Sequence, residues 1–196
     1  MQKLVTLMSI DNDFFSKRRS VLAKNMSPDP INEEDLIFIL QAGIRVPDHG
    51  AVSPWKLKVI LGNALKKIDE EVILPEFIKN KPESEKSAQD IESNRLQRAS
   101  AVIAVLSTPV DHPSIPLWEM QLSSGAVCMN LLSSAQSKGY AAQWLTEWYS
   151  YNDKMLTTLG GTVGKDKIAG FIYLGHKKEE PLERKRPDPK DIINYL

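Results

Sequence analysis

Cysteine is almost absent from this chain of 196 residues, in which Cys128 is the only one. A lone cysteine excludes a disulfide within the chain and is typical of proteins from a reducing compartment. Cys128 lies in a run of apolar and small residues, where we expect it to pack rather than to react. The sequence therefore favours a cytoplasmic protein, and no metal site is predicted.

A net charge is also missing, because 25 basic residues balance 25 acidic ones. Without an overall positive field, neither nucleic acid nor an anionic membrane surface is an expected partner. Long hydrophobic runs are missing too. The apolar stretch at residues 4–10 is short, contains Thr6 and Ser9, and runs into Asp11. It has the character of neither a signal peptide nor a membrane span.

The length predicts one domain over residues 1–196, since two ordinary domains would need a longer chain. Residues 64–98 are highly charged and are interrupted by Pro75 and Pro82, which predicts a surface helix, a loop and a second helix over 84–98, with the composition of a mobile segment. The tail from residue 177 to 196 is charged and contains proline, yet ends in apolar residues. Such an apolar end needs a surface on which to dock.

Periodicity predicts the main elements. Asn32 is a plausible cap for a helix that continues to the Pro47 stop, and residues 117–138 form the longest helical pattern, ended by Gly139. A first helix is expected within residues 11–17. Strands are predicted at residues 55–61, 99–106, 140–145 and 168–174, of which 99–106 is apolar enough to be a buried central strand.

Two clusters of donor groups carry the functional signal. Arg18, Arg19 and Ser20 combine guanidinium forks with a hydroxyl, a set that suits a phosphate or another planar polar ligand. The alternative is that both arginines are simply solvated. The second cluster lies between Arg45 and Trp55, where two prolines bracket a loop that contains His49. That loop has the composition of one that presents groups to a ligand.

The order of these features resembles the nitroreductase family, flavoproteins that hold FMN at a homodimer interface. The resemblance covers residues 14–196 and rests on motifs that recur in order. These are Arg-Arg-Ser at 18–20, Arg-Val-Pro-Asp-His at 45–49 with Pro-Trp at 54–55, Trp-Glu at 118–119, Gly139 before the Trp144 segment, and Gly-Phe-Ile-Tyr-Leu-Gly at 170–175.

The resemblance implies an α+β fold: a three-layer sandwich with a mainly antiparallel sheet flanked by helices, in a domain-exchanged homodimer whose tails (residues 177–196) dock on the partner subunit. It also implies a site. Arg18, Arg19 and Ser20 would hold the flavin phosphate and ring edge, and Arg184 or Arg186 would reach the phosphate from the tail. Arg45 and His49 would approach from the other subunit, while Trp144, Leu145 and Thr146 would line the ring, with a backbone N–H near Thr146 or Glu147 aimed at the flavin N5.

The activity implied is transfer of a hydride from NADH or NADPH to FMN and then of electrons to a nitro-aromatic, a quinone or a similar small acceptor, in a ping-pong scheme. No catalytic side chain is required. Family members often have Arg-Ser-Gly or Glu-Gly after the Trp144 position, whereas this chain has Leu145-Thr146-Glu147-Trp148. Three alternatives therefore stay open: a flavin-binding sensor or store without turnover, another flavin reaction on the same scaffold, and an interaction module whose arginines are only surface charge.

Overall fold

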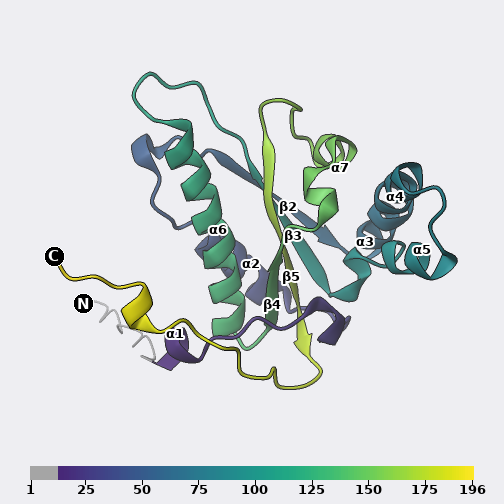
Figure 1. The fold of residues 1–196 in the computed structure, drawn as a ribbon, viewed down its shortest axis with the longest axis horizontal. Helices are drawn as coiled ribbons and strands as arrows, with labels where there is room; N and C mark the ends of the chain where they lie inside the picture. The colour runs from purple at the N-terminus through teal and green to yellow at the C-terminus, as the bar shows by residue number, and fades with distance from the viewer. Residues whose placement is uncertain (1–12) are drawn as a thin grey trace, which may run out of the picture.

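The computed structural model describes residues 13–196, which form three layers with a twisted sheet in the middle (Figure 1). The described sheet has five strands, all in antiparallel pairs: β1 (Met26–Ser27), β2 (Trp55–Leu61), β3 (Ala101–Ser107), β4 (Ala141–Leu145) and β5 (Lys167–Lys177). Strand β5 lies in the centre, between β3 and β4, and β2 pairs with β3. The predicted α+β sandwich with an antiparallel sheet is confirmed.

Strand β3 is an interior strand, between β5 and β2, and its buried β-branched and apolar residues explain this position. Every residue of β3 is buried, so both of its faces must be covered by other layers. Val102 and Leu106 face one apolar cluster, whereas Ile103 and Val105 face the other. The strands expected at 55–61, 99–106 and 140–145 are found within two residues of their predicted ends, while β5 is longer than the predicted 168–174.

One face of the sheet is covered by α2 (Glu33–Gly43) and the long helix α6 (Leu117–Ser137) (Figure 1). The predicted cap is confirmed, because the Asn32 side chain accepts hydrogen bonds from the backbone N–H groups of Glu34 and Asp35. A Cβ atom at Gly43 would lie 2.3 Å from Leu131 of α6, so the glycine permits the close approach of the two helices. Helix α2 ends at Gly43, four residues before the expected stop at Pro47.

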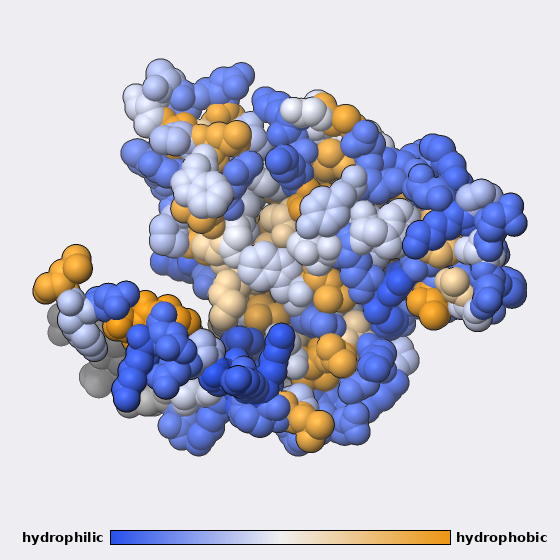
Figure 2. All heavy atoms as spheres, viewed as in Figure 1, coloured by the Kyte–Doolittle hydropathy of each residue, from blue (hydrophilic) through white to orange (hydrophobic). Residues whose placement is uncertain are grey.

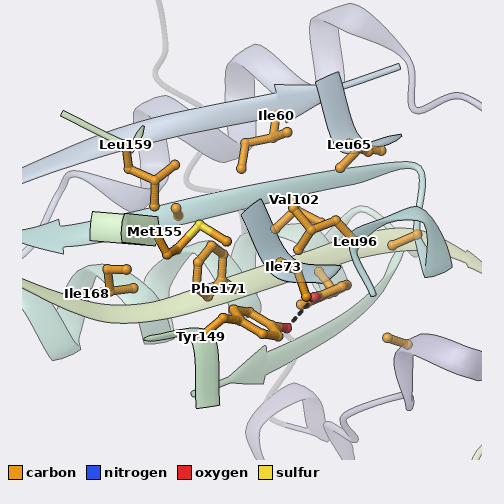
Figure 3. Packing of buried hydrophobic residues seen from close by; sticks show 14 of the residues in the cluster. Ile60, Leu65, Ile73, Leu96, Val102, Tyr149, Met155, Leu159, Ile168 and Phe171 are labelled. Carbon is orange, nitrogen blue, oxygen red and sulfur yellow. Dashed lines mark hydrogen bonds between the residues drawn. The ribbon is translucent and has the colours of Figure 1, made fainter. Parts of the chain in front are cut away.

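The other face is covered by short helices, which corrects the prediction of a surface helix, a loop and a second helix. Residues 63–98 fold into α3 (Asn63–Ile68), a π-helical turn (Asp69–Ile73), α4 (Leu74–Asn80), α5 (Lys86–Glu92) and a 3-10 turn (Leu96–Arg98). The helix expected over 84–98 is only seven residues long. Apolar residues of this segment, including Leu65, Ile73 and Leu96, pack on the sheet together with residues of α7 (Asp153–Thr158), as Figure 3 shows.

A buried carboxylate organises that segment. Asp69 is fully buried, and its side chain accepts hydrogen bonds from the backbone N–H groups of Leu96 and Gln97, at 2.9 and 3.2 Å, and from the Gln97 amide at 3.0 Å. Burial raises the pKa of Asp69, and these hydrogen bonds oppose that rise. The charged composition of residues 64–98 did not reveal this contact. The predicted mobility of these residues stays a prediction.

The C-terminal tail leaves the body after β5 and runs beside α1 (Asp13–Lys17) (Figure 1). Beyond β5 it contains one short 3-10 turn, Pro189–Asp191. Figure 2 shows apolar side chains gathered on this extension, and Leu182, Ile192, Ile193 and Leu196 are all exposed. Each of these side chains has more than half of its surface exposed. Docking of the tail on a partner subunit stays a prediction.

Within residues 13–196, no helix combines the length and the apolar character needed to cross a membrane. The apolar stretch at residues 4–10 and the start of the helix expected at 11–17 lie outside the described residues; the helix is seen from Asp13.

Candidate functional site

Three arginines from two distant parts of the chain meet near the end of α6. Arg18 and Arg19 follow α1, and Arg186 comes from the tail. An Arg18 Nη1 atom lies 3.4 Å from the Gln136 side-chain oxygen, and Arg186 donates to the Arg18 carbonyl oxygen at 3.3 Å. The Gln136 amide in turn donates to the Arg19 carbonyl. The last turn of α6 thus holds the arginine segment in place.

The electrostatics of this cluster favour an anion. Burial lowers the pKa of Arg18, and the nearby charges of Arg186 and Arg19 lower it further. One carboxylate, Glu183, forms ion pairs with Arg19 and, at 3.5 Å, with Arg186. Three guanidinium groups around one carboxylate leave positive charge that a phosphate would neutralise.

A cavity of about 1110 Å³ opens beside these arginines, in the size range of sites for large ligands. Its lining includes Ser133, Ser134 and Gln136 of α6, together with Arg18 and Arg19. Of the other residues predicted for this end, Ser20 is exposed, and the Arg184 backbone N–H donates to Glu183. Of the two tail arginines, therefore, it is Arg186 whose side chain joins the cluster.

The loop between α2 and β2 carries the second predicted cluster. Asn130 of α6 donates to the Arg45 carbonyl oxygen at 2.8 Å, and Ser123 donates to the Pro47 carbonyl oxygen at 2.8 Å. His49 Nδ1 lies 2.7 Å from Glu119 Oε2. Polar side chains on one side of α6 therefore hold the backbone of this loop and its histidine, while the Arg45 side chain is exposed.

The same loop has an unusual backbone. Gly50, Ala51 and Ser53 have φ angles of 69°, 51° and 48°, of which the last two belong to residues with a Cβ atom. Each such residue costs of the order of 1–3 kcal/mol and persists only where other contacts hold it. Here the Ser53 backbone N–H donates to Asp48 Oδ2 at 2.8 Å. Strained and tightly held loops of this kind are typical of binding sites.

The third predicted group lies at the end of β4. The Trp144 indole N–H donates to the Ala169 carbonyl oxygen at 3.2 Å, and the ring covers Gly170, where a Cβ atom would lie 2.0 Å from Trp144 Nε1. The other side of the ring approaches Gly125 of α6, and the side chain is 38% exposed. Leu145 is half-buried and Thr146 is exposed. An exposed aromatic ring next to two glycines can stack against a flat ligand.

The arginine cluster, the loop with His49 and the Trp144 segment all contact α6, so positions along this helix give their separation. Gly125, which Trp144 approaches, and Gln136, which contacts Arg18, lie on one flank of the helix, about 16 Å apart along its axis. Glu119, Ser123 and Asn130, which hold the loop, lie on another flank, about 130° around the helix. The exposed ridge between the flanks contains Leu122, which is 53% exposed. In one chain, therefore, Trp144 and Arg18 share a flank that Arg45 and His49 do not.

Similarity to known proteins establishes the family of this chain. The model described as "Nitroreductase family" matches residues 15–176. The chain belongs to the nitroreductase family. Over 184 residues it is 29% identical to "Putative NAD(P)H nitroreductase YdjA" from Escherichia coli, covering 91% of this chain and 95% of that protein.

Solved structures extend the comparison. A nitroreductase-like family protein from Bacillus cereus has a TM-score of 0.80 at 22% identity, with 94% of both chains covered. A nitroreductase with bound FMN from Bacteroides fragilis has a TM-score of 0.68 at 21% identity, covering 94% of this chain and 97% of that chain. At these identities the solved structures establish the nitroreductase fold.

The sequence of this nitroreductase-family chain did not point to Gln136, although that residue holds both arginines after α1. Its only signal was a polar side chain in the last turn of a helix. Glu119 and Gly170 were noticed as parts of motifs, but their contacts with His49 and Trp144 follow from packing. Cys128 is buried, and no group of three or more metal-ligating side chains occurs within residues 13–196.

Proposed function

We propose that this protein is an FMN-dependent oxidoreductase that uses NADH or NADPH to reduce a nitro-aromatic, a quinone or a similar small acceptor. The observation that carries the proposal is one flank of α6, where an arginine cluster contacts Gln136 and an exposed indole approaches Gly125, about 16 Å further along the helix axis. A ligand with a phosphate at one end and a flat ring at the other matches both. Membership of the nitroreductase family supports the same cofactor.

The described residues fit FMN in charge and in shape. Arg18, Arg19 and Arg186 would hold the phosphate at the cavity lined by Ser133 and Gln136, and the ring would lie beyond that lining, toward Trp144. Trp144, Leu145 and the backbone N–H of Thr146 or Glu147 would contact the ring. When bound, FMN supplies the ability to accept a hydride and to pass electrons on.

A homodimer is part of the proposal because the loop residues contact a different flank of α6 from the one that Trp144 and Arg18 contact. A second copy packed across the ridge at Leu122 would bring its own Arg45 and His49 to the cofactor. The apolar ends of the two tails would be covered in the same assembly, since Ile192 and Ile193 are exposed in the single chain.

The protein's role is then to bind, orient and stabilise charge. Arg19 would stabilise the negative charge of the phosphate, and His49, whose Nδ1 lies 2.7 Å from Glu119 Oε2, would approach the ring edge from the other subunit. No described side chain is assigned as a proton donor or a nucleophile. We infer that the nicotinamide and the acceptor stack in turn on one open face, which makes the scheme ping-pong.

A second candidate is a flavin-binding protein without turnover. The observation that favours it is the sequence Leu145-Thr146-Glu147-Trp148, in which the carboxylate of Glu147 pairs with two arginines and is not free to meet a ligand. The two candidates share a cofactor and differ in whether a nicotinamide can reduce it.

Visible absorption spectra of the purified protein test both candidates. The spectra are recorded before FMN is added, after it is added, and after anaerobic addition of NADH or NADPH. Bound flavin whose bands bleach with either nicotinamide supports the oxidoreductase, whereas bound flavin that never bleaches supports the binding role. A protein that takes up no FMN would contradict both.

A further inference from the structure

The segment after Trp144 is held from one side by an extensive polar network. Glu147 Oε1 lies 3.0 Å from Arg98 Nη2, and Glu147 Oε2 lies 3.1 Å from Arg95 Nη1. The next residue, Trp148, donates its indole N–H to Glu92 Oε2 at 3.0 Å. Residues 147 and 148 are thus tied to α5 and the turn that follows it.

The network continues into the sheet. Arg98 Nη2 lies 3.5 Å from the Tyr173 hydroxyl, and the guanidinium lies 5.2 Å from the centre of the Tyr173 ring. Tyr173 in turn shares a 2.6 Å hydrogen bond with Tyr149, drawn as a dashed line from Tyr149 in Figure 3. Three successive residues after Thr146 therefore each contact a group more than twenty residues away in the sequence.

The backbone that carries Arg95 and Arg98 is itself held by buried contacts. Leu96, between them, is fully buried, and its backbone N–H donates to the buried carboxylate of Asp69. Arg95 also pairs with Glu92, and Arg98 donates to the Arg95 carbonyl oxygen at 2.7 Å. The side chains of Arg95, Arg98 and Glu147 are all less than 25% exposed, so solvent screens these ion pairs less than surface pairs.

We propose that Arg95, Arg98 and Glu147 form a clamp that fixes the backbone of Thr146 and Glu147 beside Trp144, and so positions the peptide N–H that contacts the flavin ring. The inference rests on the proposed function. The three are positioning residues, since their charged groups form ion pairs with one another and do not contact the ligand. The clamp also gives a physical reason for a glutamate and a bulky tryptophan here: distant ion pairs define the path of the backbone.

The test compares Glu147→Gln with the wild-type protein in two measurements. Glutamine keeps the size of the side chain but removes the charge that pairs with both arginines. In the ligand-free protein, amide hydrogen exchange at residues 145–148 should become about tenfold faster, the change expected when roughly one polar interaction is lost. The matched control is Glu71→Gln, the same chemical change at an exposed ion pair with Lys67. It should leave hydrogen exchange at residues 145–148 unchanged.

Affinity provides the second measurement. Glu147→Gln should weaken the binding of FMN and the binding of riboflavin by the same factor, about tenfold, because the clamp acts at the ring and both flavins carry the ring. A variant in the arginine cluster should weaken FMN alone. The variant Arg95→Lys keeps a positive charge for the buried Glu92 but loses the planar fork that also reaches Glu147. It serves if Glu147→Gln does not fold, and it should show both effects at about threefold.

The outcomes separate the two proposals. Wild-type protein that binds flavin, with clamp variants that change neither exchange nor affinity, overturns the clamp and leaves the proposed function standing. Faster exchange with unchanged riboflavin affinity also overturns it, because the clamp would then be structural only. Wild-type protein that binds neither flavin overturns the proposed function and the inference with it.

Discussion

Glu119 in the first turn of α6 holds His49 at 2.7 Å, while Gln136 in the last turn of the same helix holds Arg18 at 3.4 Å. The two contacts lie about 25 Å apart along the helix and on different flanks. A single helix thus holds two groups of candidate site residues at its opposite ends, and the proposed homodimer would bring one group from each subunit to the same cofactor.

Complementation between subunits follows from this geometry. Arg19→Ala and Arg45→Ala should each lose FMN binding as homodimers. Co-expression of the two variants should restore about a quarter of the sites, because half of randomly formed dimers are mixed and each has one intact site. Bound flavin per chain, read from absorption, is the measurement.

The matched control for this experiment is co-expression of two single variants, Arg18→Ala and Arg19→Ala. Both residues lie on the same flank of α6, so every site in a mixed dimer keeps one defect and no binding should return. Recovery in the control, or none with Arg19→Ala and Arg45→Ala, would contradict a site shared between subunits.

The two tail arginines should behave differently. Arg186 reaches the Arg18 segment, whereas the only hydrogen bond or ion pair of Arg184 within the described residues is the one from its backbone N–H to Glu183. Arg186→Ala should weaken FMN binding by about 10- to 100-fold, as expected for a charge-assisted hydrogen bond to phosphate. Arg184→Ala serves as the control. Fluorescence titration with FMN and with riboflavin checks this, and an equal loss for riboflavin would rule out a phosphate contact.

Substitution of Gly170 tests how closely Trp144 is packed. Gly170→Ala would place a methyl group 2.0 Å from Trp144 Nε1 and force the indole away from Ala169. We expect a loss of about 1–3 kcal/mol in the free energy of unfolding, the usual cost of overpacking.

Gly125→Ala is the control for this substitution, since its Cβ would lie 3.9 Å from the same ring. It should be neutral or stabilise α6 by up to about 1 kcal/mol. Urea unfolding followed by circular dichroism measures both variants. Equal stabilities for the two would mean that the indole has room to move.

The buried thiol should make stability fall at high pH. Burial raises the pKa of Cys128 from 9.0 to about 12, so between these values the unfolded chain loses a proton that the folded chain keeps. The free energy of unfolding should therefore fall by about 1.4 kcal/mol per pH unit above pH 9 from this group. Cys128→Ala lacks this contribution, while every other titrating group is the same in both proteins.

Urea unfolding of the wild-type protein and of Cys128→Ala at pH 8, 9 and 10 tests this. The difference between their free energies of unfolding should shift in favour of the variant as the pH rises. Parallel pH profiles would show that the thiol titrates alike in the folded and unfolded states.

The sequence by itself determined what depends on neighbouring residues. The Asn32 cap, the strand Trp55–Leu61, the turn at Gly139 and the long pattern of α6 are local, because a cap, an alternation or a helical repeat is written in residues within a few positions of one another. The residue types that suit a phosphate and a flat ring were also visible at this level.

Only the tertiary structure decided which of those residues share a surface. Arg186 of the tail reaches the carbonyl oxygen of Arg18, whose side chain contacts Gln136 of α6. The charged segment at 63–98 folds onto the sheet because its scattered apolar residues meet there. The partners of Glu147 come from that same segment. Distances between residues far apart in the chain follow from how layers pack, and packing depends on the whole set of buried side chains together.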